Sequence, residues 1–392
     1  MPAEKVLPGQ KHAFILQVMN NRKTLKLAAV IDGPGWNFSS WRHPDMPADA
    51  GENIDFFIQQ AQLAEQAKFE TLFLYDVSHV GPGNIPYYLS MFEGGTLMSA
   101  LAMKTERIGL SLTASTSYTD PYNLARKVLS LDKISKGRAS LNAITSNPGG
   151  MVNFSRGHLG KADQYPMHQE FLEILLGLWD TYEDDAFPRD KESGVFLNPR
   201  KMHPINYRGK YFSVDGPLNL SRSVQGRPVL YMAGSSPTFV DLATSYTDGV
   251  FMAGSSFEET LSLSNALTAK LLEKGRQPAD FVRSVAQNPI VGRTDAEAYA
   301  KYQAIRALGP YSHRPVPLFM GSAERIANEV QKWYEAGAID MLMVQQDHPY
   351  GIQDFIELVV PILQERGLFH TEYEAQTLRG NLGLPTPAFR TI

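Results

Sequence analysis

The sequence contains no cysteine. Disulfide bonds, thiolate metal ligands and cysteine nucleophiles are therefore excluded, and any chemistry must use other side chains. Long hydrophobic runs are also missing: no apolar stretch approaches the ~18 residues that would cross a bilayer. The first residues lack the basic start and apolar run of a signal peptide. These absences favour a chain without a membrane anchor, and we expect a cytoplasmic location.

The sequence also lacks a strong excess of positive or negative charge. The formal net charge is −4 at pH 7, and no run of about five like charges occurs. This balance does not provide the basic surface that nucleic acids require. We therefore expect neither a nucleic-acid partner nor a membrane partner.

Several catalytic templates are missing too. The sequence has no HExxH zinc motif, no serine nucleophile elbow and no Walker A loop. His168 and Glu170 are two residues apart in a predicted helix, so they point to different faces. We expect no metal site, and the common hydrolase and nucleotide-hydrolase classes are excluded.

What the sequence does contain is an alternation of short β-rich apolar segments and longer segments with helical spacing. This alternation is typical of a parallel sheet whose strands are joined by helices. Eight such units occur in the 392 residues, and eight parallel strands close a (β/α)8 barrel. Residues 1–392 are therefore predicted to form one α/β domain of the TIM-barrel class. The predicted strands begin near Lys26, Thr71, Arg107, Arg138, Pro228, Gly249, Ser284 and Asp340.

Helical spacing predicts the crossovers between these strands, and two regions interrupt the pattern. Residues 183–226, rich in Pro and Gly, are predicted to be an inserted hairpin and long loop on the rim, after the fourth unit. Residues 370–392 show no periodicity, and we expect a C-terminal tail that wraps the surface or a neighbouring subunit. The predicted helices include residues 53–68, 163–182, 257–274, 323–336 and 352–367.

Polar residues terminate several of the predicted strands. Active sites of (β/α)8 barrels lie at the carboxyl ends of the strands. Asp76 follows the second strand, Ser115 lies in the third and Asn142 lies in the fourth. Each of these residues also fits an ordinary turn or cap, and the sequence leaves both interpretations open.

The segment AGSSPTFVDLA predicts an anion site at the end of the fifth strand. Ser236 is placed as a helix N-cap, with Ser235 before it and Pro237 as the first helical residue. Free backbone N–H groups at a helix start attract a phosphate-sized anion. Many helices that open with Ser-Pro bind nothing, so the position at a strand end carries the prediction.

Two loops add candidate site residues. His158 and Tyr165 lie in a polar, glycine-containing loop that leads into a helix, where they could hydrogen-bond an anion or a ring edge. The loop GPGWNFSSWRHPD after the first strand contains Trp36, Trp41, Arg42 and His43, which could form an aromatic wall with a cationic or proton-transferring tip. An ordinary solvated loop is the alternative in both cases.

Longer segments resemble a known family. The sequence is similar to the nitrilotriacetate, pristinamycin IIA synthase and dibenzothiophene-sulfone monooxygenase branch of the bacterial-luciferase-like superfamily. The similarity is carried by GRASLNAITSN, NFSRGH, YPMHQEFLEILLGLWDTYEDDAF, GPLNLSRSVQGRPVLYMAGSSP and VVPILQERGLFHTEYEAQTLRGNLGLP, and it runs from about residue 25 to residue 384. The resemblance implies a luciferase-like (β/α)8 barrel that binds FMN at its C-terminal face.

The resemblance also implies the activity and the site. Reduced FMN, delivered by a separate NAD(P)H:flavin reductase, would react with O2 to a C4a-hydroperoxyflavin that oxygenates a small organic substrate. A homodimer or homotetramer is expected. Flavin contacts carry over to Asp76, Ser115, Asn142, His158, Tyr165, Ser235 and Ser236. Imidazole is a common proton-transfer group, so His43 or His158 could fill that role.

Two departures from the family pattern keep alternatives open. Residues 292–321 are shorter than the family's segment near the seventh unit, so we expect either a reduced lid or an omitted stretch near GPYSHRPVP. NPGGMVNF differs from the family's loop beside the flavin, which keeps a deazaflavin-dependent hydride-transfer oxidoreductase as an alternative. A flavin-binding protein without catalysis is the other alternative, because a short lid would expose the site to water.

Overall fold

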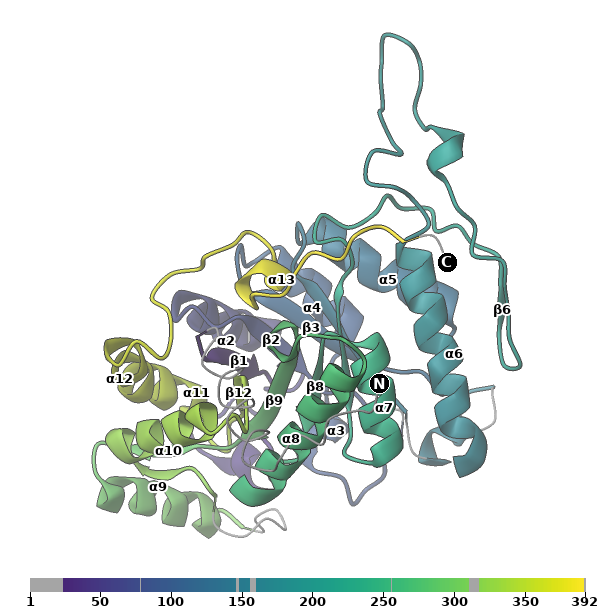
Figure 1. Cartoon of the computed structure of the whole chain (residues 1–392). Helices are drawn as coiled ribbons and strands as arrows, with labels where there is room; N and C mark the ends of the chain where they lie inside the picture. The colour runs from purple at the N-terminus through teal and green to yellow at the C-terminus, as the bar shows by residue number, and fades with distance from the viewer. Residues whose placement is uncertain are drawn as a thin grey trace, which may run out of the picture.

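The computed structural model describes residues 24–77, 79–145, 148–155, 160–254, 256–309 and 317–390. Eight parallel strands close into a barrel that helices surround (Figure 1). The predicted (β/α)8 fold is confirmed, and each predicted strand start lies within two residues of the observed one. The barrel strands are β1 (Lys26–Val30), β2 (Thr71–Leu74), β3 (Gly109–Ser115), β4 (Ala139–Ile144), β7 (Val229–Ala233), β8 (Gly249–Met252), β9 (Val282–Gln287) and β12 (Met341–Val344).

The strands follow one another around the barrel in sequence order, and β12 closes it against β1. Side chains of a strand alternate between the barrel interior and the surrounding helices. Phe73, Tyr231 and Met343 belong to the cluster inside the barrel, whereas Leu110 and Leu112 of β3 pack under the helices. Both faces of each strand are therefore buried, which explains the continuous apolar runs in the sequence.

The helices cover the outside of the barrel. The predicted helices are confirmed, although the last one contains a π-helical turn at Phe355–Val359. Within the described residues, none of these helices is long and apolar enough to cross a membrane. The helices are α2 (Ile54–Gln66), α3 (Pro86–Leu89), α4 (Gly94–Ala102), α5 (Pro121–Ile134), α6 (Lys161–Trp179), α7 (Pro237–Tyr246), α8 (Phe257–Glu273), α9 (Asp295–Ala307), α10 (Ala323–Glu335), α11 (Gly351–Asp354) and α12 (Val360–Glu365).

The seventh unit differs from its prediction at one point. The segment predicted as a single strand from Ser284 divides at Asn288 and Pro289, because proline cannot donate to a sheet ladder. Its second part, β10 (Ile290–Gly292), leaves the barrel and pairs in parallel with β11 (Met320–Ser322). A small separate sheet therefore stands beside β9.

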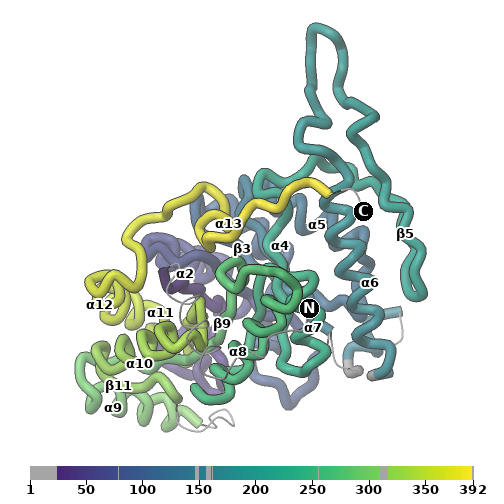
Figure 2. Tube along the Cα trace, in the orientation of Figure 1, coloured from purple at the N-terminus to yellow at the C-terminus, as the bar shows by residue number. Residues whose placement is uncertain are grey.

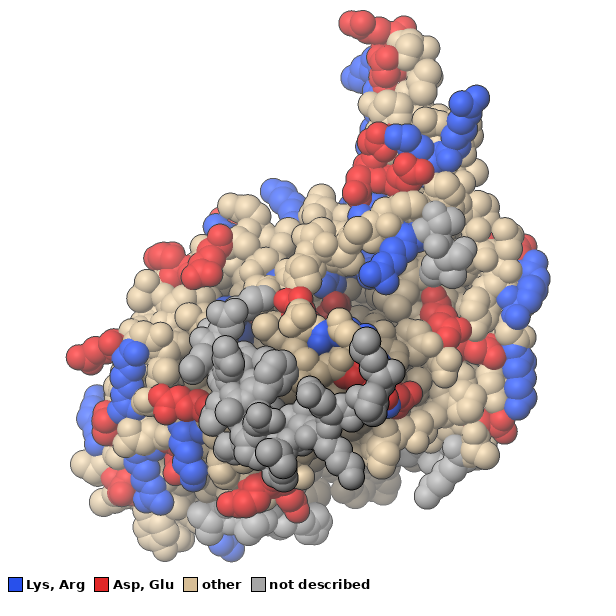
Figure 3. Space-filling model, viewed as in Figure 1, with Lys and Arg blue, Asp and Glu red and all other residues tan. Residues whose placement is uncertain are grey.

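The insertion leaves the barrel as an extended arm. Figure 1 and Figure 2 show this arm, residues 183–201, rising away from the body of the molecule. The rest of the insertion contains an antiparallel hairpin of β5 (Tyr207–Arg208) and β6 (Ser213–Val214), which lies beside α6. Glu170 of α6 accepts the backbone N–H groups of Lys210 and Tyr211 at 2.8 and 3.0 Å, so α6 holds the hairpin. Figure 3 shows acidic and basic side chains mixed over the visible face of the molecule.

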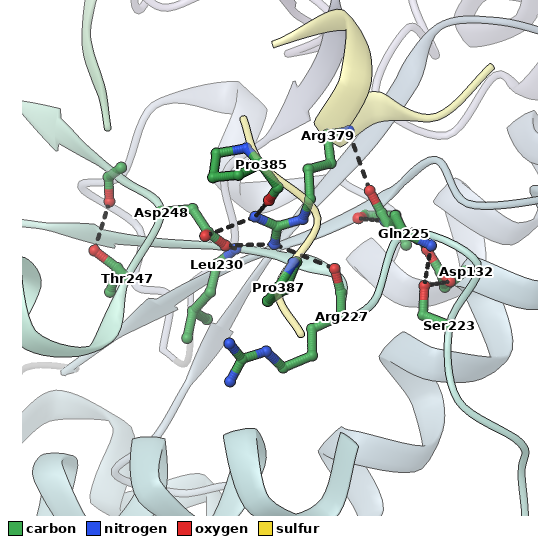
Figure 4. Close-up of polar contacts among 12 residues, drawn as sticks. Asp132, Ser223, Gln225, Arg227, Leu230, Thr247, Asp248, Arg379, Pro385 and Pro387 are labelled. Carbon is green, nitrogen blue, oxygen red and sulfur yellow. Dashed lines mark hydrogen bonds and ion pairs between the residues drawn. The ribbon is translucent and has the colours of Figure 1, made fainter. Parts of the chain in front are cut away.

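Part of the C-terminal tail is more deeply buried than the sequence predicted. Residues that were expected on the surface form α13 (Leu378–Asn381), and Leu378, Leu382 and Leu384 pack into the cluster inside the barrel. A Cβ on Gly109, the first residue of β3, would lie 2.5 Å from Leu378 Cδ1, so α13 covers the amino-terminal end of the barrel. Figure 4 shows Arg379 of α13 beside Asp248. Burial of these leucines holds the helix in place, since a four-residue helix is not stable alone.

Candidate active site

The carboxyl ends of β3 and β4 bring polar side chains together. Thr113 lies opposite Asn142, and Asn142 Nδ2 donates to Thr113 Oγ1 at 3.2 Å. Asn142 is 2% exposed, and neither its Oδ1 nor the buried Oγ of Ser115 has a partner among the described residues. An unpaired buried polar atom costs about 1–3 kcal/mol. We interpret these atoms as prepared for a ligand that forms hydrogen bonds.

Asp76 follows β2 on the same side of the barrel. Its Oδ1 accepts the backbone N–H of Val77 at 2.7 Å. Its Oδ2 lies near Gly94 at the start of α4, since a Cβ on Gly94 would be 3.8 Å from it. Burial raises the pKa of Asp76 to about 6, and nearby Glu93 adds to this increase. A carboxyl group with this pKa gains and loses a proton near neutral pH, as a general acid or base requires.

Ser235 and Ser236 follow β7, and Ser236 caps α7 as the sequence predicts. Its Oγ accepts the Phe239 N–H at 3.2 Å. Tyr165, from the first turns of α6, reaches the same place, with its hydroxyl 3.1 Å from Ser236 Oγ. Gly234 lets the end of β7 pass close to the Phe239 ring of α7. Its φ is +155°, and a Cβ there would lie 2.8 Å from that ring. The structure therefore brings Tyr165 to the helix start at which an anion is favoured.

His43 lies after a short 3-10 turn, η1 (Ser40–Arg42), and faces the loop that follows β12. Its ring meets Tyr350 edge-on, with 6.2 Å between the centroids, and its Nδ1 is 3.8 Å from Asp45 Oδ2. Arg42 donates to the backbone carbonyl of Leu308, so it anchors the end of α9. His158, the other residue predicted for proton transfer, lies outside the described residues.

An aromatic group forms around Trp36, as the tryptophan-containing loop suggested. The ring centroid of Trp36 lies 5.0 Å from that of Tyr75, 5.9 Å from that of Tyr87 and 5.3 Å from that of Tyr88. Tyr75 directly precedes Asp76 in the chain. The aromatic group therefore forms a wall beside Asp76, whereas Trp41 is 47% exposed and takes no part in it.

A second polar cluster, which the sequence analysis missed, lies where β1 and β12 end. Asp32 is fully buried and accepts Gln345 Nε2 at 3.2 Å; burial raises its pKa well above the ordinary carboxyl value. Asp347 accepts Asn288 Nδ2 at 2.8 Å. These residues end the first and eighth strands, so the rule that identified Asp76 would also have found them.

Two further histidines are buried near the strand ends. Burial lowers the pKa of His168 to about 4, and its Nδ1 lies 2.7 Å from Thr116 Oγ1. Burial, with smaller effects of Lys301 and His43, also lowers the pKa of His348 to about 4. Both imidazoles are therefore neutral near pH 7 and can serve as hydrogen-bonding groups rather than as cations.

Two sets of candidate ligand contacts thus lie at the carboxyl ends of the strands. The start of α7, with Tyr165 and Ser236, suits a phosphate. The unpaired oxygen atoms of Asn142 and Ser115 suit the polar edge of a heterocyclic ring. FMN has both a phosphate and such a ring, so the side chains present fit this group.

Comparisons with known proteins give the family. The profile described as luciferase-like monooxygenase matches residues 36–356. N-acetyl-S-(2-succino)cysteine monooxygenase of Bacillus subtilis (strain 168) is 36% identical over 436 aligned positions, which cover 95% of this chain and 99% of the relative. Nitrilotriacetate monooxygenase component A of Aminobacter aminovorans is 30% identical, over 94% and 98% of the two chains. The solved EDTA monooxygenase from Chelativorans sp. BNC1 has a TM-score of 0.82 at 26% identity, covering 93% of this chain and 99% of that one.

The chain belongs to the luciferase-like monooxygenase family, and it is a flavin-dependent monooxygenase. The resemblance inferred from the sequence segments is confirmed. The alignment with the Bacillus relative has more positions than this chain has residues, so that relative contains residues without a counterpart here. The shortening within residues 292–321 stays a prediction, because residues 310–316, with His313 and Arg314, lie outside the described part of the chain.

Proposed function

We propose that the protein is the oxygenase of a two-component system, which takes up reduced FMN from a separate NAD(P)H:flavin reductase and oxygenates a small organic substrate with O2. One observation carries the proposal: Tyr165 and Ser236 meet at the start of α7, at the barrel face that also carries the unpaired oxygen atoms of Asn142 and Ser115. The name of one relative, nitrilotriacetate monooxygenase component A, implies a second component and so supports a partner protein for this chain.

The roles of the cofactor residues follow from their chemistry. Tyr165, Ser235 and Ser236, at the positive end of the α7 dipole, would hold the phosphate. Asn142 and Ser115 would bind the polar edge of the flavin ring. When bound, reduced FMN supplies the electrons with which O2 is activated.

The protein's own groups would control protons and water. Asp76, with a pKa of about 6, can hold or release a proton at its carboxyl oxygen. His43, which is partly exposed at the rim beside Asp45, remains a candidate for proton transfer. The aromatic wall around Trp36 would exclude water from the space beside Asp76. His158 stays in the proposal as a flavin or proton-transfer residue on the resemblance alone.

The proposal extends to location and assembly. A reductase that uses NAD(P)H would draw on the cytoplasmic pool, which supports a cytoplasmic location. We also propose a homodimer or homotetramer. The arm supports this assembly, since Phe196 is 63% exposed and Val195 is 44% exposed there, and exposed apolar side chains that lie together favour protein contacts.

Anaerobic titration of the purified protein with reduced FMN tests the proposal. We expect reduced FMN to bind, and admission of 18O2 with a panel of organic substrates to give one product that carries one labelled oxygen atom. Tighter binding of a reduced deazaflavin than of reduced FMN would contradict the proposal and support hydride transfer. Binding of reduced FMN that ends only in hydrogen peroxide, for every substrate, would support a flavin-binding protein without catalysis.

A further inference from the structure

A cleft of about 650 Å³ runs between α4 and α5 and reaches the end of β3. We call it the α4–α5 cleft. Its volume lies within the range of small-molecule sites, about 300–1,000 Å³. Asp76, Thr113 and Ser115 line it, and these are residues of the candidate cofactor site. The cleft is therefore continuous with the place at which we expect the flavin ring.

Polar side chains that form hydrogen bonds line much of the cleft. The Oγ of Ser115, which we assign to the flavin ring, is buried and has no partner among the described residues, so the cleft meets the candidate flavin contacts at this atom. The backbone of Gly95 lies beside these side chains, at the start of α4. The other hydroxyl and amide side chains of the lining are those of Thr96, Ser99, Thr119, Asn123 and Ser130.

Two cations line the cleft on the α5 side. Arg126 and Lys127 are both exposed, and neither forms an ion pair of 4 Å or less within the described part of the chain. Glu93 is close enough to Lys127 for an electrostatic effect, but its carboxylate already accepts the N–H groups of Gly95 and Thr96 at 3.0 and 2.7 Å. The two positive charges are thus not neutralised by a bonded carboxylate.

An apolar surface completes the cleft. Phe154 lines it and stacks on Tyr118, with 4.9 Å between the ring centroids and 9° between the planes. Leu112, Leu124 and Leu131 add aliphatic surface. The cleft therefore offers contacts to the carbon skeleton of a ligand as well as to its charged and polar groups.

We propose that the α4–α5 cleft is the substrate site and that the substrate is a small organic carboxylate. Its carboxylate groups bind Arg126 and Lys127, and its uncharged part lies against Phe154, next to the candidate flavin contact Ser115. The inference rests on the proposed function, since oxygen transfer requires the substrate to lie against the flavin, and the cleft meets the candidate flavin contacts at Asp76 and Ser115. Unneutralised cations in a cleft also attract anions and increase their rate of association.

The test measures binding to the full chain by isothermal titration calorimetry, without flavin. The probes are succinate, citrate and N-acetyl-S-carboxymethylcysteine, and succinamide is the uncharged control. We expect at least one carboxylate to bind and succinamide not to bind. The double variant Arg126→Gln/Lys127→Gln should weaken the carboxylate by about tenfold or more, as expected for loss of two charged contacts. Lys104→Gln, an exposed cation outside the cleft, should change the Kd less than about twofold.

Binding of reduced FMN to the same preparations separates the two proposals. A double variant that keeps wild-type affinity for reduced FMN is folded, so its loss of carboxylate binding supports the cleft. Equal carboxylate affinity in the double variant and the wild type, or no binding of any carboxylate to the wild type, overturns the cleft proposal and leaves the proposed function standing. A wild-type protein that binds carboxylates through Arg126 and Lys127 but does not bind reduced FMN supports the anion site and overturns the proposed function.

Discussion

Ser236 caps α7 and also contacts Tyr165, so its removal has two separable effects. We expect Ser236→Ala to lower the free energy of unfolding by about 1 kcal/mol, as loss of an N-cap does. The affinity for reduced FMN should fall about tenfold, because a hydrogen bond to a charged group contributes ~1.5–3 kcal/mol. Urea denaturation and anaerobic titration measure the two effects.

Ser256 provides the matched control for this variant. It caps α8, where its side chain accepts the Glu259 N–H at 3.2 Å, as Ser236 does on α7. Ser256→Ala should therefore lose similar stability and keep its affinity for reduced FMN. If Ser236→Ala behaves like Ser256→Ala in both measurements, Ser236 is a helix cap and not a cofactor contact.

Asp76 should make stability depend on pH. Burial raises its pKa to about 6 from the ordinary value of 3.8, so the native state binds this proton more tightly than the unfolded chain does. The resulting stabilisation is complete below about pH 4 and is lost as the pH rises through about 6. Asp76→Asn removes this titration. Relative to the wild type, the variant should gain roughly 2–3 kcal/mol in free energy of unfolding between about pH 4 and pH 7.

Urea denaturation of both proteins across this pH range measures the difference. A gain that appears between about pH 4 and pH 7 and then levels off assigns the titration to Asp76. A difference that is the same at every pH would show that the Asp76 carboxyl titrates normally in the native state, contrary to the burial seen here.

At the scale of elements, α13 is held by an ion pair between buried Arg379 and partly buried Asp248, in addition to its buried leucines. Arg379 Nη1 and Nη2 each donate to Asp248 at 2.8 Å, and Arg379 is 3% exposed. Burial opposes ionisation of Asp248, but the Arg379 guanidinium outweighs this effect, and the pKa of Asp248 is lowered. Arg379→Met leaves the partly buried carboxylate of Asp248 with the Leu230 N–H as a donor but without its guanidinium partner, which should cost up to about 3 kcal/mol in urea denaturation at neutral pH.

Two further variants test whether burial of the pair causes this loss. Arg208→Gln breaks an exposed pair with Asp215 and should cost at most about 1 kcal/mol. Asp248→Asn added to Arg379→Met should restore part of the stability, because it removes the unpaired charge. If the double variant is no more stable than Arg379→Met, the charge of Asp248 is not the cause of the loss.

The elements also show which parts of the fold the sequence could predict. The barrel strands are apolar runs bounded by polar residues, so their starts follow from local pattern. The helix α13 has no such pattern, because it is held by leucines that reach the barrel and by a pair whose members are 131 residues apart. Tyr165 and Ser236 could be selected one by one as candidates, but only the closed barrel brings them to 3.1 Å. Asp32 follows the first strand as Asp76 follows the second, so local pattern marks its position, whereas its hydrogen bond to Gln345 depends on closure of the barrel by β12.

At the scale of the whole molecule, the barrel and its arm should be separable. Glu183 and Lys201 are joined by a backbone hydrogen bond of 3.2 Å at the base of the arm, and Asn198 donates to the Ala186 carbonyl at 2.8 Å further out. Beyond this point the arm stands away from the body (Figure 1), and Phe196 is 63% exposed. Replacing residues 187–197 with an Asn-Gly turn keeps the chain path and removes few buried contacts.

We expect this shortened protein to keep its free energy of unfolding within about 1 kcal/mol, since exposed loops contribute little to the core. Its affinity for reduced FMN should be unchanged. Truncation after residue 376 is the contrasting change, because it removes Leu378, Leu382 and Leu384 from the barrel interior; it should cost several kcal/mol, about 2–5 for each buried leucine lost. Reduced FMN affinity that falls in the arm variant would show that the insertion belongs to the cofactor site. A lower mass by light scattering would instead place the arm between subunits.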